Sequence, residues 1–196
     1  MRRLVLILAL LILIAALGIW STAQTSGFFQ RYPGGTAHAV YQIIDQKLTN
    51  PLKLGFDVQP ASGDQLTVTT TNQITASRAE LDGGGISEGV AAAQLAINDP
   101  AVQALMGQQL QMGTTYVLPG GARFSTDQAT TIVGVPVIEG TLTDPQKPDQ
   151  RTRLAFAEGD AALTLPFPPL IQTQKLQDGQ YQTIFSLQLI EFSHQP

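Results

Sequence analysis

Residues 52–74 read LKLGFDVQPASGDQLTVTTTNQI, and they hold the clearest structural signal in the chain. Apolar side chains occupy every second position from Leu52 to Val58, and β-branched residues dominate from Leu66 to Ile74. A period of two with β-branched enrichment is typical of half-buried strands. The two runs are separated by PASGD at 60–64, whose residues favour turns. This stretch therefore predicts a β-hairpin.

Downstream of residue 114, the sequence predicts further strands separated by turn residues. The expected strands cover residues 114–118, 122–125, 130–142, 152–157, 161–165 and 181–192. Gly134 and Pro136 fall inside the third of them, so a bulge, a bend or an edge position is expected there. The pattern predicts a mainly antiparallel sheet with long strands.

Two to three amphipathic helices are expected beside this sheet. Thr36 offers an N-cap after the chain-breaking YPGG of 32–35, and a helix ending before Asn50 is predicted. The apolar face of this helix would consist of Ala37, Val40, Tyr41, Ile44 and Leu48. It is expected to pack on the sheet, with the membrane surface as the alternative. Ser87 and Asp99-Pro100 supply two more helix starts. Residues 36–196 are thus assigned an α+β fold.

The N-terminus predicts a transmembrane anchor over residues 1–23. Leu4 to Trp20 is an unbroken apolar run that includes Leu10 and Leu17, and no charge follows it until Arg31. At about 1.5 Å per residue, this run spans about 26 Å of a hydrocarbon core of roughly 30 Å. Residues 24–35 would form a juxtamembrane linker.

The flanking charges predict the orientation of the anchor. Arg2 and Arg3 precede the apolar run, so the N-terminus should stay in the cytoplasm and the domain should be extracytoplasmic. Cleavage after Ala23 by a signal peptidase is the alternative, because small residues precede that point. The length of the run and the aromatic residues around it favour retention.

Composition excludes several functional classes. The chain contains no cysteine, which rules out disulfides, thiolate metal sites and cysteine nucleophiles. Without Arg2 and Arg3, 9 basic residues stand against 15 acidic ones, a balance of −6. An acidic domain lacks the electrostatic footprint of a nucleic-acid-binding protein.

No motif predicts catalysis, a metal site or a cofactor. His38 and His194 are the only histidines, neither lies at metal-ligand spacing from the other, and both are interpreted as surface residues. A G-x-S-x-G elbow is missing from the sequence. Gly83-Gly84-Gly85 precedes Ile86 and not the Lys and Ser or Thr of a phosphate-binding loop.

Residues 163–171, LTLPFPPLI, form the most distinctive segment of the domain. Three prolines disfavour a central strand, so the segment should cover the core, cap a cavity, or face a membrane or partner. Core cover is the first interpretation. The second is an interaction surface made by Leu165, Phe167, Leu170 and Ile171.

The sequence favours a membrane-anchored binding or scaffold protein over an enzyme. It would serve an envelope partner or be an accessory subunit of a membrane complex. A tethered lipid or apolar-ligand carrier is the alternative, since long strands with amphipathic helices resemble, in outline, extracytoplasmic lipid-binding or lipid-transfer domains. This likeness is one of architecture and is carried by no motif. An envelope hydrolase is the least favoured reading.

Overall fold

The computed structural model describes residues 32–78, 85–106 and 108–196. The compact unit Pro33–Pro196 carries the fold. Its strands are β1 Thr36–Asp45, β2 Leu52–Pro60, β3 Leu66–Ile74, β4 Thr115–Val117, β5 Arg123–Ile132, β6 Val135–Thr143, β7 Gln150–Ala157, β8 Leu170–Gln177 and β9 Gln180–Gln195. The helices are α4 Gly85–Ile97, α5 Pro100–Leu105 and α6 Ala161–Thr164, with a short 3-10 turn, η1, at Pro119–Gly121.

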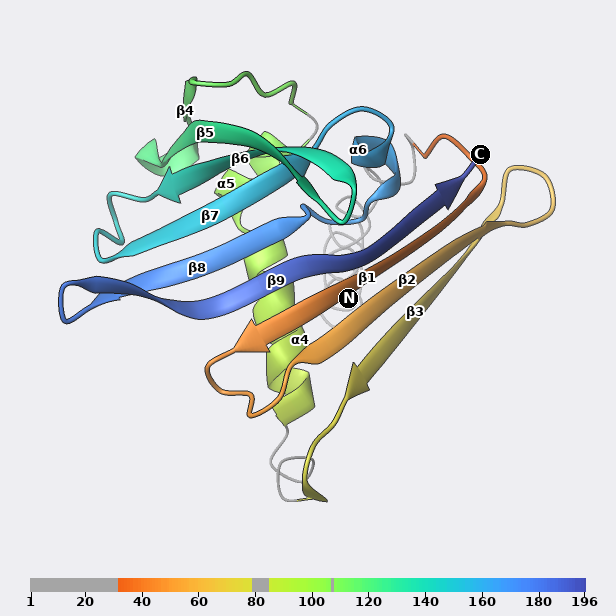
Figure 1. The fold of residues 1–196 in the computed structure, drawn as a ribbon, viewed down its shortest axis with the longest axis horizontal. Coiled ribbons are helices and arrows are strands. Elements are labelled where there is room, and N and C mark those ends of the chain that lie inside the picture. The colour runs from red at the N-terminus through yellow and green to blue at the C-terminus, as the bar shows by residue number, and fades with distance from the viewer. Residues whose placement is uncertain (1–31, 79–84, 107) are drawn as a thin grey trace, which may run out of the picture. The chain divides into compact units, whose positions relative to one another are not determined.

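The strands form one antiparallel sheet in the order β3-β2-β1-β9-β8-β7-β6-β5-β4. The first and last strands, β1 and β9, are neighbours in its interior, and hairpins extend the sheet from them in both directions (Figure 1). The prediction of a mainly antiparallel sheet with long strands is confirmed. The few helices make a smaller part of the fold than the α+β assignment implied.

The hairpin predicted from residues 52–74 is confirmed. β2 and β3 pair without interruption from Leu52 opposite Ile74 to Pro60 opposite Leu66. A second local signal is confirmed at α5, where the Asp99 side chain accepts a hydrogen bond of 2.8 Å from the Ala101 N–H. Pro100 occupies the first turn of this helix, where its missing N–H costs nothing.

The helix expected to begin at Thr36 is wrong, because these residues form β1. Positions 37, 41, 44 and 48 have helical spacing, but positions 37, 39, 41 and 43 equally fit a strand. The strand buries Ala37, Ala39, Tyr41 and Ile43, all at most 6% exposed. It also gains hydrogen-bonded partners on both sides, β2 and β9, and this tertiary pairing decides between the two periodicities.

Other predicted boundaries also need correction. The strand expected over 130–142 is a hairpin whose turn, Val133 and Gly134, has φ of 51° and 77°. Positive φ at both central residues is the geometry that joins twisted strands most tightly. Residues 161–164 are helical, residues 170–177 form the unpredicted strand β8, and α4 begins at Gly85, two residues before Ser87.

The core lies between one face of the sheet and the helices α4 and α5. Ala93 and Ile97 of α4 and Val102 and Leu105 of α5 belong to one buried cluster with the inward side chains of the sheet. In Figure 1, α4 runs behind the sheet across β9 and β1. A Cβ on Gly89 of α4 would lie 2.8 Å from Leu48 Cδ1, so glycine permits this close approach.

The predicted membrane anchor lies outside the described residues. Leu4, Leu10, Leu17 and Trp20 all belong to this undescribed N-terminal segment. Within the described part of the chain, no helix is long and apolar enough to cross a membrane. The anchor therefore stays a prediction.

Candidate functional site

A row of polar side chains crosses three neighbouring strands on the face of the sheet turned away from the core. His38 alternates along β1 with the buried residues Ala37 and Ala39, so it points to the opposite face. Asp57 of β2 and Ser193 of β9 lie directly opposite His38 in the two strand registers. Antiparallel partners share a face, so this pairing gathers all three side chains.

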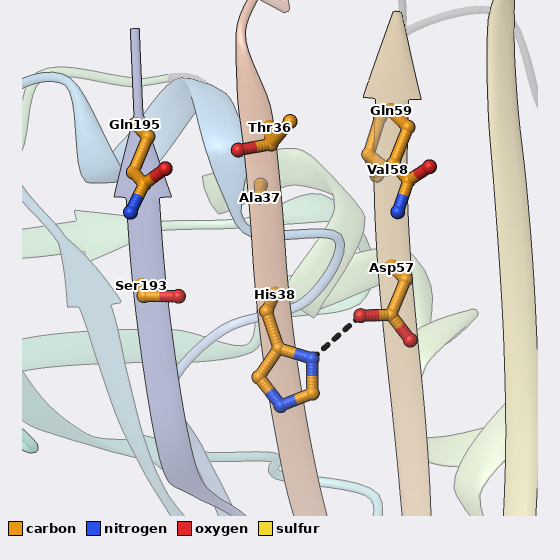
Figure 2. A pocket seen from close by; sticks show the side chains of 8 residues that line it. All are labelled: Thr36, Ala37, His38, Asp57, Val58, Gln59, Ser193 and Gln195. Carbon is orange, nitrogen blue, oxygen red and sulfur yellow. Dashed lines mark hydrogen bonds and ion pairs between the residues drawn. The ribbon is translucent and has the colours of Figure 1, made fainter.

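His38 stands between two carboxylates. Its Nδ1 lies 2.7 Å from Asp57 Oδ1, within hydrogen-bonding distance, and its Nε2 lies 3.9 Å from Glu191 Oε2. Figure 2 shows the imidazole turned toward Asp57, with Ser193 on the neighbouring strand. The side chains of His38 and Asp57 are each 42% exposed. They are therefore fixed by their partners but remain accessible to solvent.

The row borders a hollow of about 250 Å³. Its lining, here called the His38 hollow, consists of Thr36, Ala37, His38, Asp57, Val58, Gln59, Ser193 and Gln195 (Figure 2). Two hydroxyls, two amides, an imidazole and a carboxylate face a small volume, so hydrogen-bond donors and acceptors are concentrated there. This hollow is polar, unlike the apolar cavity expected of a lipid carrier.

Ser193, His38 and Asp57 are the residue types of a serine-hydrolase triad, but their arrangement does not activate the serine. Among the described contacts, Ser193 Oγ makes no hydrogen bond to His38, whose Nε2 lies 3.9 Å from Glu191 Oε2. β1 is paired along both edges, so its own N–H groups are engaged in the sheet and are not free to act as oxyanion donors.

A second polar cluster joins β5, β6 and β7 around the buried Glu139. Glu139 is 6% exposed, forms an ion pair with Arg153, and accepts a hydrogen bond of 2.8 Å from Gln128 Nε2. These partners compensate the buried carboxylate, as burial of a charge requires. The contacts of Glu139 are therefore those that a buried carboxylate needs in a folded protein.

The described residues contain no group of three or more His, Cys, Asp or Glu that could hold a metal ion.

In the predicted interaction surface at 163–171, the structure buries two of the four named residues and leaves the other two partly exposed. Leu165 and Ile171 are buried, at 4% and 1% exposed, while Phe167 and Leu170 are partly buried. The Phe167 ring meets Tyr41 and Phe56 edge-on, with centroid distances of 5.6 and 5.1 Å. These contacts favour core cover, and an interaction surface around Phe167 and Leu170 stays a prediction.

A hydrogen bond fixes the backbone of this segment. The Tyr41 hydroxyl donates to the Phe167 carbonyl oxygen at 2.8 Å. Burial raises the pKa of Tyr41 above its usual value, so the hydroxyl keeps its proton at neutral pH and remains a donor. Tyr41 thus ties the proline-rich segment to β1.

The His38 hollow was missed by sequence reasoning. His38 was interpreted as a surface residue, which agrees with its partial exposure, but its neighbours come from distant parts of the chain. His194 lies on the other side of β9, where its Nε2 is 3.0 Å from the Gly34 carbonyl oxygen. Gly83 and Gly84 lie outside the described residues.

Comparisons with known proteins give no family. No family model matches the chain, and no curated protein matches it. A crystal structure of MucB is similar, with a TM-score of 0.39 and 14% identity over 89% of this chain. The Pseudomonas aeruginosa MucA/MucB complex gives 0.39 and 12% over 85%, and MucB in complex with MucA(peri) gives 0.36 and 10% over 88%.

The chain spans only part of these structures, 60%, 54% and 56% of their respective lengths. TM-scores below 0.5 with such low identity assign neither a fold family nor a function to this chain.

Proposed function

We propose that this chain is a non-enzymatic binding protein, anchored by residues 1–23 and displaying its sheet domain outside the cytoplasm. The observation that carries the proposal is the His38 hollow, where polar groups from three strands converge on a solvent-accessible face. A paired sheet holds such groups at fixed positions, which reduces the ordering cost of recognition.

The shape and charge of the hollow favour a protein partner that presents a basic side chain. A volume of about 250 Å³ is below the range of about 300–1,000 Å³ usual for small-molecule pockets. Asp57 lines the hollow, and Glu191 lies near His38 Nε2 outside the lining, so Asp57 is the carboxylate that an inserted cation would meet. Lysine or arginine at the centre of an interface would be recognised by charge-assisted hydrogen bonds there.

Native mass spectrometry of the full-length chain, extracted in detergent from its own membrane, tests this proposal. We expect Asp57→Asn to reduce retention of the bound protein about ten-fold, because one charge-assisted contact is worth about 1.4 kcal/mol or more. Asp64→Asn is the matched control, because it removes an exposed carboxylate in the turn between β2 and β3. Equal retention by both variants would contradict a role for the hollow.

The location of the domain has its own test. If residues 1–23 remain as an anchor with Arg2 and Arg3 inside, protease added to spheroplasts should degrade the domain while cytosolic markers survive. Full protection of the domain would refute this topology. N-terminal sequencing would separate retention from cleavage, since a mature terminus at Gln24 means release.

A tethered carrier of lipid or another apolar ligand is the second candidate. The cluster of Tyr41, Phe56 and Phe167 favours it, because the Phe56 and Phe167 rings are partly accessible beside the apolar core. Bound lipid and no bound protein in the same mass-spectrometric experiment would select this function.

A further inference from the structure

β3 is a long and unprotected edge of the sheet. It stands at one end of the strand order, and no described strand lies on its other side. Its nine residues, LTVTTTNQI, include neither proline nor a charged residue, and its register with β2 contains no bulge. Its outer N–H and C=O groups thus form an unpaired row that can accept another strand.

The opposite edge of the sheet is protected. β4 has three residues, Thr115–Val117, and the chain then enters the turn η1 with Pro119 in its first turn. Beyond β4 this edge is formed by residues 127–132 of β5, which follow a bulge between Thr126 and Gln128 and begin with the charged Asp127. Short edge strands, prolines, charges and bulges are devices that prevent pairing between sheets. Their presence at one edge and their absence at the other make β3 the selective site for strand addition.

We infer that β3 pairs antiparallel with β3 of a second copy of this chain, about a twofold axis through Thr70. Directly opposite residues of an antiparallel pair both direct their backbone N–H and C=O groups toward the partner or both direct them away from it, in alternation along the strands. Successive residues of β3 direct their backbone groups alternately toward β2 and away from it, so two residues that pair must be an even number of positions apart in the sequence. The two residue numbers of each pair therefore add to an even value. The twofold axis then passes between the two copies of one residue. Thr70 is the central residue of Leu66–Ile74, so an axis there gives every residue of the strand a partner in the second copy.

This register is self-complementary. Leu66 falls opposite Ile74, and Val68 falls opposite Asn72, on the face that continues the apolar residues of β2. Val68 is 40% exposed in the single chain, and the added strand would cover part of it. The other face would pair threonine with threonine, at Thr69 and Thr71.

Charge also favours a second copy. Self-pairing brings each strand against its own sequence, so any net charge on β3 would face itself, and β3 has none. In the antiparallel pair, the end of β3 that follows Asp64 in one copy lies beside the end of β3 that precedes Arg78 in the other copy. Full pairing would add roughly eight to ten backbone hydrogen bonds, comparable with the ten or so of an ordinary interface.

Disulfide trapping tests both the dimer and its register, because the natural chain has no cysteine to give a background. Full-length Thr70→Cys in its membrane should cross-link on mild oxidation, since opposite Cα atoms lie about 4.5–5.5 Å apart, within disulfide range. Thr67→Cys is the matched control on the same strand. Its two copies would lie six residues apart along the pair, about 20 Å, and should cross-link at least ten-fold more slowly.

Two further variants make the result decisive. Mixed Thr67→Cys and Gln73→Cys chains should form the heterodimer, because these positions share a rung in the proposed register. Thr70→Lys should abolish the dimer in native mass spectrometry, because two charges would meet on the axis. Monomeric Thr70→Cys, equal rates at Thr67 and Thr70, or faster trapping at Thr69 or Thr71 would overturn the proposal. Loss of a different protein on Thr70→Lys would overturn it in favour of a partner strand.

Discussion

Replacing Gly140 by alanine is expected to lower the free energy of unfolding by about 3 kcal/mol, near the upper end of the usual cost of overpacking. Gly140 lies in β6, and a Cβ there would collide with the Ser125 backbone oxygen and lie 2.7 Å from the Phe124 ring. Phe124 is fully buried, and the Phe156 ring packs against it with a centroid distance of 5.7 Å. Neither the backbone pairing of β5 with β6 nor the Phe124 ring can move without disturbing the core.

Gly55→Ala provides the matched control. Gly55 also lies within a strand, but its added Cβ would be 3.6 Å from Thr71 Cβ, an ordinary contact. Alanine there should be neutral or stabilise by up to about 1 kcal/mol, because it restricts the unfolded chain. Thermal denaturation should separate the variants by about 10 °C for a domain of this size. Equal melting temperatures would show that β5 and β6 adjust freely around Gly140.

Local signals determined what the sequence could predict. The alternation at 52–58 and the β-branched run at 66–74 are joined by turn residues, so the hairpin needs no distant partner for its recognition. The cap at Asp99 is equally local, since acceptor and donor are two residues apart. In both cases every determinant lies within a short window, and the structure confirms both predictions.

The misassigned strand β1 depends on distant residues. Its sequence satisfies helical spacing through Ala37, Tyr41 and Leu48 and strand spacing through Ala37, Ala39 and Tyr41. Pairing with β2 on one side and with β9, from the other end of the chain, on the other side favours the strand. β8 was missed for a different reason, because it starts directly after Pro169 and the prolines dominated the interpretation of that region.

The His38 hollow could not be predicted, because it depends on this same pairing. The alternation at 52–58 puts Asp57 on the polar side of its strand, but the helix predicted from Thr36 separates His38 from that strand. With β1 as a strand, the hairpin partner β2 would have brought Asp57 near it. Ser193 would still have remained hidden, since no local pattern pairs the last strand with the first.

Phe167→Asp should destabilise the domain by about 3 kcal/mol, at the low end of the range for a buried phenylalanine because Phe167 is partly exposed. The substitution removes two edge-on ring contacts, with Tyr41 and Phe56, and brings a carboxylate against their aromatic surface. The Tyr41 hydroxyl binds the Phe167 carbonyl, so the backbone of the segment is held in place and cannot carry the charge far into solvent. Chemical denaturation of the full-length chain measures the loss.

Val117→Asp is the control for introducing the same charge at an exposed apolar site. Val117 is 74% exposed on β4, so its replacement should change stability by no more than about 0.5 kcal/mol. If the Phe167→Asp variant is as stable as Val117→Asp but binds liposomes or a partner more weakly, the segment is an interaction surface and not a cover of the core. Leu170, the other partly exposed residue of the predicted surface, should then behave like Phe167, whereas buried Leu165 and Ile171 should not.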